Sequence, residues 1–261
     1  MNAASLYTID PATGTSTLIG STGKSHVVAL AVHPITHEIY AIANENSNNG
    51  ELLKLDPNTG AATSIGFTGL QVPDMTFNAA GVLYAWAEGC DACPHGNDFL
   101  ATINLTNGQF SFVGDDGIGT ASTGLAYGPN NILYLKSEDE MFELNPANGD
   151  ELSMNTLIGG IDLENNNTLA FNLSGSTLYS VERVEDSGND FVNSYLQTIN
   201  LTTNQVSNIG LTGVPNLAAI SFGYCFSAPI PTMNEWGLMI FGLLILNLGV
   251  MFVYRKETFV A

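Results

Sequence analysis

Alternating apolar and polar positions flank a short turn-forming segment at several places along the chain. The clearest copy covers 52–66, with the sequence LLKLDPNTGAATSIG, in which two apolar runs border Asp56, Pro57 and Gly60. Proline fixes φ early in a turn, an aspartate side chain bonds the backbone two residues later, and glycine accepts positive φ. The segment therefore predicts a β-hairpin.

This hairpin recurs along the chain at intervals of about 40 to 55 residues, and a second hairpin with a small, apolar first strand lies between the copies. The first kind returns at 6–20, 100–114, 141–159 and 196–210, and the second kind covers 28–43, 74–86, 124–135 and 168–180. Four strands per period of this length are typical of a β-propeller blade. We expect an all-β chain with four-stranded blades at about 28–66, 73–114, 122–159 and 167–210.

A fifth blade is expected from the two ends of the repeat region. Residues 216–222 match the first strand of a blade, and 5–20 would supply its outer two strands and close the ring. No second strand follows Phe222. The fifth blade is therefore incomplete, or residues upstream of Met1 supply the missing strand. A flat β-array or a sandwich is the alternative fold.

The repeat LYTIDPATGTSTLIG at 6–20 and its copies resemble the LYxIDPxTGxxTxIG units of bacterial repeat proteins. Those proteins belong with quinoprotein-like and Kelch-like propellers. The resemblance covers 5–222, and it implies the propeller fold without a particular activity.

Charge is sparse and one-sided in this chain of 261 residues, which has 6 Lys and Arg, 25 Asp and Glu, and a net charge of −19. Nucleic acid is excluded as a partner, because contacts with phosphate need basic side chains. In a propeller, most of these acids fall on the face with the long loops, where binding sites usually lie. A solvated acidic rim explains them. The functional alternative is Ca²⁺ binding, for which Asp186 and Asp190 are the best local candidates.

Cys90 and Cys93 stand in a long loop, with His95 close behind. A disulfide between the two cysteines would staple this loop in an oxidising compartment. A metal site with His95 and a redox pair are the alternatives. The metal site lacks a second Cys-x-x-Cys to complete its ligands. The redox pair lacks the helix N-terminus that such a pair needs.

The C-terminal segment differs from the repeats. Residues 237–254 are apolar and long enough to cross a bilayer, with Trp236 and Tyr254 at their ends, where aromatic side chains anchor to membrane interfaces. Arg255 and Lys256 follow directly. A positive cluster at that position predicts a transmembrane helix with its C-terminus in the cytoplasm and the propeller outside.

The residues before this span resemble the IPTL-CTERM sorting signal, a relative of the PEP-CTERM tails. The matching positions are Ile230, Pro231, Thr232, Glu235, Trp236 and Gly237. The family's usual leucine after the threonine is Met233 here, and its basic cluster is longer than Arg255 and Lys256. The resemblance implies recognition by a membrane-embedded sorting protease of the exosortase type. It also implies export, so we expect an upstream extension that encodes a signal peptide.

These observations together divide the chain into a propeller at 1–225, a linker with the sorting motif at 226–236, a transmembrane helix at 237–254 and a cytoplasmic tail at 255–261. We expect an exported, membrane-anchored or surface-sorted propeller of the cell envelope that acts as a binding, adhesion or matrix module. Its partners would be the lipid bilayer, the sorting protease and a protein or glycan ligand.

A propeller enzyme is the alternative function, such as a quinone- or metal-dependent dehydrogenase, a lactonase or a lyase. Such enzymes gather acidic and basic side chains near the central channel. The starts of the first strands carry one acid and no base; the five residues there are Val28, Asp74, Thr123, Thr168 and Asn216. The sequence therefore predicts no catalytic residues and a protein that is not an enzyme, with Ca²⁺ as the one cofactor considered.

Overall fold

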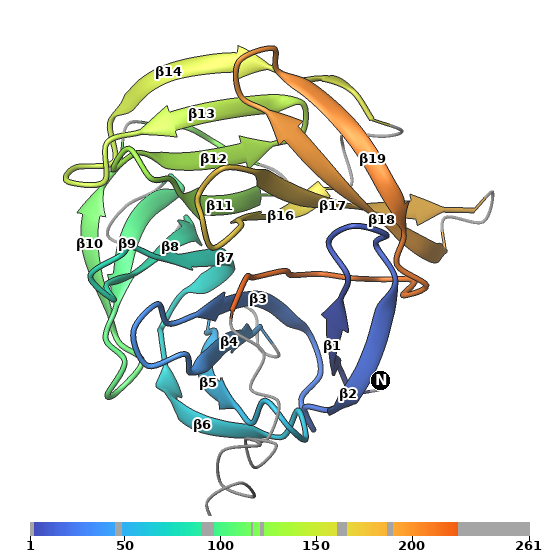
Figure 1. Cartoon of the computed structure of the whole chain (residues 1–261). Helices are drawn as coiled ribbons and strands as arrows, with labels where there is room; N and C mark the ends of the chain where they lie inside the picture. The colour runs from blue at the N-terminus through green and yellow to red at the C-terminus, as the bar shows by residue number, and fades with distance from the viewer. Residues whose placement is uncertain are drawn as a thin grey trace, which may run out of the picture. The chain divides into compact units, whose positions relative to one another are not determined.

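The computed structural model describes residues 3–44, 49–89, 97–115, 117–120, 123–160, 166–186 and 190–223, and over these residues it contains strands and no helix. The all-β prediction is confirmed. The compact unit Met1–Gly223 contains four blades that surround a common axis, with β3, β7, β11 and β16 nearest the centre (Figure 1).

Each blade is an antiparallel sheet whose strands follow chain order from the axis outward. The first blade contains β3 (Val27–Val32), β4 (Ile39–Ala43), β5 (Glu51–Leu55) and β6 (Ala62–Phe67). The second contains β7 (Gln71–Phe77), β8 (Leu83–Glu88), β9 (Phe99–Ile103) and β10 (Phe110–Gly114). The third contains β11 (Thr123–Tyr127), β12 (Leu133–Ser137), β13 (Glu140–Leu144) and β14 (Glu151–Thr156). The fourth contains β16 (Asn166–Phe171), β17 (Leu178–Glu185), β18 (Phe191–Asn200) and β19 (Gln205–Leu211), and β15 (Ile158–Gly159) pairs with β19 in parallel.

The N-terminal hairpin of β1 (Ser5–Ile9) and β2 (Ser16–Ser21) lies between the fourth and first blades. On one side, the Ser16 N–H donates to the Thr212 carbonyl at 3.3 Å; on the other, the Ala62 N–H donates to the Thr22 carbonyl at 3.2 Å. The hairpin therefore closes the ring, as the sequence predicted, but it is a separate two-stranded sheet, so the described chain has four blades and the predicted fifth blade is wrong.

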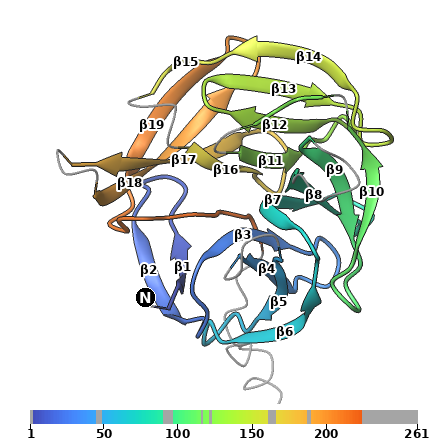
Figure 2. The same ribbon diagram turned by 180° about the vertical axis from the view of Figure 1, so that it is seen from behind.

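The prediction of a strand at 216–222 is wrong. This segment runs towards the centre of the ring in both views (Figures 1 and 2), but it forms no ladder. Two side-chain contacts hold it instead. The Ile220 N–H donates to Thr168 Oγ1 at 3.2 Å, and the Val32 N–H donates to Ser221 Oγ at 3.1 Å. The physical reason is the missing neighbour, because no second strand of the described chain pairs with this segment.

Glycines of the repeat make the closest contacts between successive blades. A Cβ placed on Gly66 would lie 2.1 Å from the Asn107 carbonyl oxygen in the turn of the next blade, and one on Gly210 would lie 2.2 Å from that of Thr13. No side chain fits at such a distance. A glycine at or next to the end of β2, β6, β10 and β19 thus lets the neighbouring turn approach the backbone itself.

Aromatic pairs form a second contact between blades, nearer the axis. A tyrosine on the second strand of a blade packs against an aromatic residue at the end of the next blade's first strand or, for the fourth blade, in the segment 216–222. The pairs and their centroid separations are Tyr40–Phe77 at 5.6 Å, Tyr84–Tyr127 at 5.6 Å, Tyr134–Phe171 at 5.4 Å and Tyr179–Phe222 at 4.8 Å.

We predict that Gly66→Ala destabilises the propeller, because its methyl group would overlap the Asn107 carbonyl. Overpacking of this kind costs about 1–3 kcal/mol, which for a domain of this size lowers Tm by several degrees. The matched control is Gly119→Ala, since a Cβ on Gly119 meets nothing within 4 Å. Thermal unfolding of the two variants measures the difference, and equal melting temperatures would show that the contact between blades is unimportant.

Candidate functional site

The innermost strands of neighbouring blades are joined by side chains, because they form no ladder with one another. Backbone N–H groups at an open strand edge need acceptors when they are buried. Thr76 Oγ1 on β7 accepts from the Tyr127 N–H of β11 at 3.2 Å. Ser221 accepts from Val32 and Thr168 accepts from Ile220 in the same manner. Hydroxyls of β7, of β16 and of the segment 216–222 therefore accept from backbone N–H groups of neighbouring segments.

Asp74 makes the same kind of contact with two strands at once. Its Oδ2 accepts from the Leu125 N–H at 2.8 Å and from the Leu169 N–H at 3.3 Å, and its Oδ1 accepts from the Met75 N–H at 2.9 Å. The side chain thereby connects β7, β11 and β16. Gly124 leaves the necessary space, since a Cβ there would lie 2.8 Å from the backbone of Thr168.

Burial dominates the electrostatics of this carboxyl group. Asp74 is only 1% exposed, and desolvation raises its pKa well above the ordinary value, although the backbone donors oppose that shift. The sequence identified Asp74 as the one acid at the start of an inner strand. The structure shows that its oxygens are occupied by backbone donors of three strands.

A cavity of about 490 Å³ opens at one end of the axis, next to the turns that join the first and second strands of the blades. We call these the inner turns. Four aromatic side chains, each partly exposed, lie in its wall among a larger number of aliphatic residues. They come from the ends of β7, β11 and β16 and from the segment 216–222, and are Phe77, Tyr127, Phe171 and Phe222.

The polar groups of the cavity are amides and hydroxyls. Asn78, Asn172, Ser174 and Ser221 contribute to its wall, and the Tyr127 hydroxyl donates to Asn131 Oδ1. Burial raises the pKa of Tyr127, so its hydroxyl stays protonated at neutral pH. The described lining contains no acidic side chain, no lysine, no arginine and no histidine.

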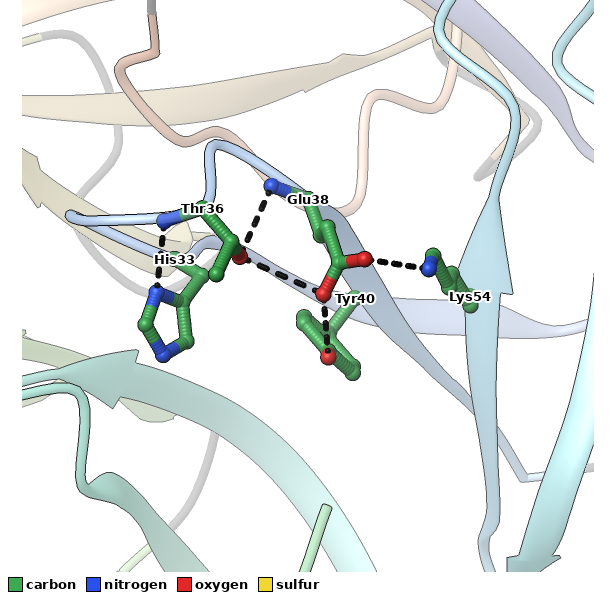
Figure 3. A network of polar contacts seen from close by, with 5 residues as sticks. All are labelled: His33, Thr36, Glu38, Tyr40 and Lys54. Carbon is green, nitrogen blue, oxygen red and sulfur yellow. Dashed lines mark hydrogen bonds and ion pairs between the residues drawn. The ribbon is translucent and has the colours of Figure 1, made fainter. Parts of the chain in front are cut away.

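The inner turn of the first blade is stabilised by a polar network (Figure 3). His33 Nδ1 accepts from the backbone N–H of Thr36 at 3.1 Å, and the His33 ring packs edge-on against Phe77 at 4.9 Å. Glu38 accepts from the Tyr40 hydroxyl at 3.0 Å and pairs with Lys54. These contacts fix the turn beside the cavity.

Ionisation in this network follows from the same contacts. The hydrogen bond from Lys54 holds the pKa of Glu38 below its ordinary value, whereas burial raises the pKa of Tyr40 to about 12. Glu38 and Lys54 therefore form an ion pair at neutral pH.

The Ca²⁺ candidates Asp186 and Asp190 directly follow β17 and directly precede β18. The Asp190 N–H donates to Asp186 Oδ1 at 3.1 Å, and the Asp186 N–H donates to the Asp190 carbonyl at 3.0 Å. In the part of the chain that the structure describes, no three His, Cys, Asp or Glu side chains form a group suited to a metal ion. The geometry supports a turn-closing role for this pair.

Several other predicted site residues lie outside the described residues, so the predictions made for them stay predictions. These are Cys90 and Cys93, the sorting motif Ile230, Pro231, Thr232, Glu235, Trp236 and Gly237, and the basic pair Arg255 and Lys256. Among the residues with described structure, no helix has the length and hydrophobicity to cross a membrane.

The cavity lies at the end of the ring opposite to the long acidic loops, where the sequence favoured binding. The missed signal is an aromatic residue that recurs at the end of the inner strands, at Phe77, Tyr127 and Phe171, and again at Phe222 in the segment 216–222. The repeat could be read from the sequence, but which end of the axis stays open depends on packing between blades.

Comparison with known proteins shows the fold. No family model and no curated protein matches the chain. Among solved structures, it is similar to a glutaminyl cyclase from Myxococcus xanthus, with 13% identity, a TM-score of 0.50, and 72% and 71% of the two chains covered. A protein described as a symmetrical protein of de novo evolutionary emergence shows 18% identity and a TM-score of 0.50, with 81% and 91% covered. The gluconolactonase XC5397 from Xanthomonas campestris shows 13% identity and a TM-score of 0.46, with 80% and 68% covered.

These similarities correct the prediction that the protein is not an enzyme. Structures with the same fold include an enzyme, the glutaminyl cyclase. The prediction that excluded an enzyme is therefore wrong. Identity of 13% establishes the fold alone, and no catalytic residue or substrate follows from it.

We predict that Asp74 makes stability depend on pH. Because its folded-state pKa is raised, the folded state loses stability as the pH rises from about 4 through that higher value, at about 1.4 kcal/mol per unit of pKa difference. Asp74→Asn removes the ionisation, so its stability relative to the native protein should increase across this range. Urea unfolding from pH 4 to 8 measures the difference. Asp150→Asn, at an exposed turn, is the control for charge, and parallel pH profiles of all three proteins would contradict the prediction.

Proposed function

We propose that this protein is an exported propeller of the cell envelope that binds an uncharged ligand in the central cavity at the inner turns. The observation that carries the proposal is the lining of that cavity, which consists of aliphatic and aromatic side chains, amides and hydroxyls, without an acidic or basic side chain among the described residues. Its volume of about 490 Å³ is within the range of small-molecule sites.

The chain carries 25 acidic residues, but none of them is in the described lining of the cavity. An ionic ligand would lose its hydration in this cavity without meeting an opposite charge, which is unfavourable. A neutral ligand loses less, and it gains contact with the aromatic faces of Phe77, Tyr127, Phe171 and Phe222. The cavity therefore suits a neutral molecule with apolar and hydroxyl groups.

The cellular location is part of the proposal and rests on the sequence. The motif from Ile230 to Gly237, the apolar span 237–254 and the basic pair Arg255 and Lys256 occur in the order of an IPTL-CTERM sorting signal. The span would hold the protein in the bilayer, with the propeller outside the cytoplasm, until a sorting protease of the exosortase type acts on it.

Binding is tested with the full-length protein in detergent and a panel of neutral, anionic and cationic oligosaccharides and neutral peptides. We expect neutral members to bind the native protein and binding to be lost in Ala79→Trp, because Ala79 lines the cavity and is exposed at an inner turn. Ala12→Trp, at an exposed turn outside the lining, should bind as the native protein does. Selective binding of charged members, or equal binding by the two variants, would overturn the proposal.

The envelope location makes its own prediction. Replacing both Leu243 and Leu244 by Arg should release the protein from membranes, because each charge at mid-span costs about 3 kcal/mol on insertion scales. Membrane fractionation of the double variant is compared with Leu243→Ile and Leu244→Ile, which keep the span apolar. Retention of the arginine variant in membranes would show that 237–254 does not span them.

A further inference from the structure

A second cavity of about 520 Å³ adjoins the central one and leads outward between the third and fourth blades. Three residues line both cavities: Pro129, Phe171 and Gly175. Beyond them the wall comes from β12, from β17 and β18, and from the turn that follows β18. A ligand held in the central cavity therefore has a second compartment next to it.

The boundary between the two cavities has a defined shape. Gly175 has φ +69°, and a Cβ there would lie 3.1 Å from Pro129 Cβ, so glycine lets the two inner turns come together. Phe171 packs edge-on against Tyr134 with centroids 5.4 Å apart, and Tyr134 lines the second cavity. One aromatic pair thus serves as wall for both compartments.

The second cavity also has no acidic or basic side chain in its described lining. Thr177, Thr198 and Thr202 line it, and their hydroxyls make no hydrogen bond to another described residue. Asn200 is committed to its own turn, since its Oδ1 accepts from the Thr202 N–H at 2.9 Å. The lining therefore presents threonine hydroxyls and the partly exposed ring of Phe171, with Tyr134, only 5% exposed, packed behind it.

This combination matches the chemistry of a neutral sugar chain. The C–H faces of sugar rings pack on aromatic rings, and their hydroxyl groups both donate to and accept from threonine hydroxyls. An extended peptide fits less well, because peptide recognition by a sheet needs an open strand edge. Beside this cavity, β12, β17 and β18 are each paired on both edges.

We propose that the two adjoining cavities bind one linear, neutral glycan, with its terminal sugar in the central cavity and the following sugars between the third and fourth blades. This inference rests on the proposed function and adds the class of the ligand and its direction along the surface.

The test uses neutral glucose and mannose oligomers of increasing length, with affinities measured by calorimetry on the full-length protein. Affinity for the native protein should rise about tenfold from the monosaccharide to a trimer, which corresponds to one or two added hydrogen bonds. Thr202→Trp should abolish this gain and keep the affinity for the monosaccharide, since Thr202 lines only the second cavity.

A matched control exists in the second blade. Thr106 is exposed in an Asn-Leu-Thr turn of the same sequence as the turn that contains Thr202, and it lines neither cavity. Thr106→Trp should therefore keep both the monosaccharide affinity and the gain with length. Thr198→Val, which removes a hydroxyl at nearly constant volume, should reduce the gain without affecting the monosaccharide.

The possible failures are distinguishable. If monosaccharides bind in the central cavity and length adds nothing, this inference is wrong and the proposed function stands. If neutral peptides bind in a manner sensitive to Thr202→Trp and glycans do not, the ligand class is wrong. If no neutral member of the panel binds, the proposed function itself fails.

Discussion

The propeller depends on close approach between backbones of neighbouring blades at the glycines of its repeat. A Cβ on Gly20, Gly66 or Gly210 would lie about 2 Å from a carbonyl oxygen of the next turn, so a larger residue would force the blades apart. The same contact joins the N-terminal hairpin to both of its neighbours, through Gly14 against Gly210 and through Gly20 against Thr59. Between the third and fourth blades, the parallel pairing of β15 with β19 takes its place. The ring is therefore closed at its outer rim by one repeated glycine contact and, between the third and fourth blades, by a short parallel ladder.

The spacing of the blades at the outer rim determines how the inner strands lie around the axis. With the blades fixed this closely, inner strands face one another without room for a shared ladder, and their N–H groups take side-chain acceptors such as Thr76, Thr168 and Ser221. Asp74 extends this arrangement across three strands and fills the axis. Toward the inner turns the same kind of contact continues through Thr76 and Ser221, both of which line the cavity. The cavity therefore lies beyond the last of these contacts, where the aromatic residues Phe77, Tyr127, Phe171 and Phe222 contribute to its wall.

The sequence predicted the hairpins, the blade limits and the closure by the N-terminal hairpin, because these depend on local turn chemistry and period. It missed what depends on pairs of residues in different blades. The partners Tyr134 and Phe171 belong to different repeats, and nothing local shows that they meet. In the sequence, Asp74 was the one acid considered as part of a catalytic site, because the three backbone N–H groups that donate to it carry no sequence signal. The strand expected at 216–222 failed for a related reason: its apolar pattern is correct, but a strand needs a partner to form a ladder.

The junction between the segment 216–222 and the first blade explains why the wall of the central cavity is asymmetric. Three junctions carry a tyrosine from a second strand against an aromatic residue of the next blade, and a fourth carries Tyr179 against Phe222 of the segment 216–222. At the remaining junction no second strand supplies a tyrosine among the described residues, and the first blade has Val32 where the others have an aromatic residue. This junction thus lacks both the tyrosine and the aromatic residue of the pair, as expected when an aromatic ring occurs at this position only where a partner packs against it. The cavity wall is therefore aliphatic beside β3 and aromatic beside β16, which places the richer contacts for a ligand toward the third and fourth blades, where the second cavity begins.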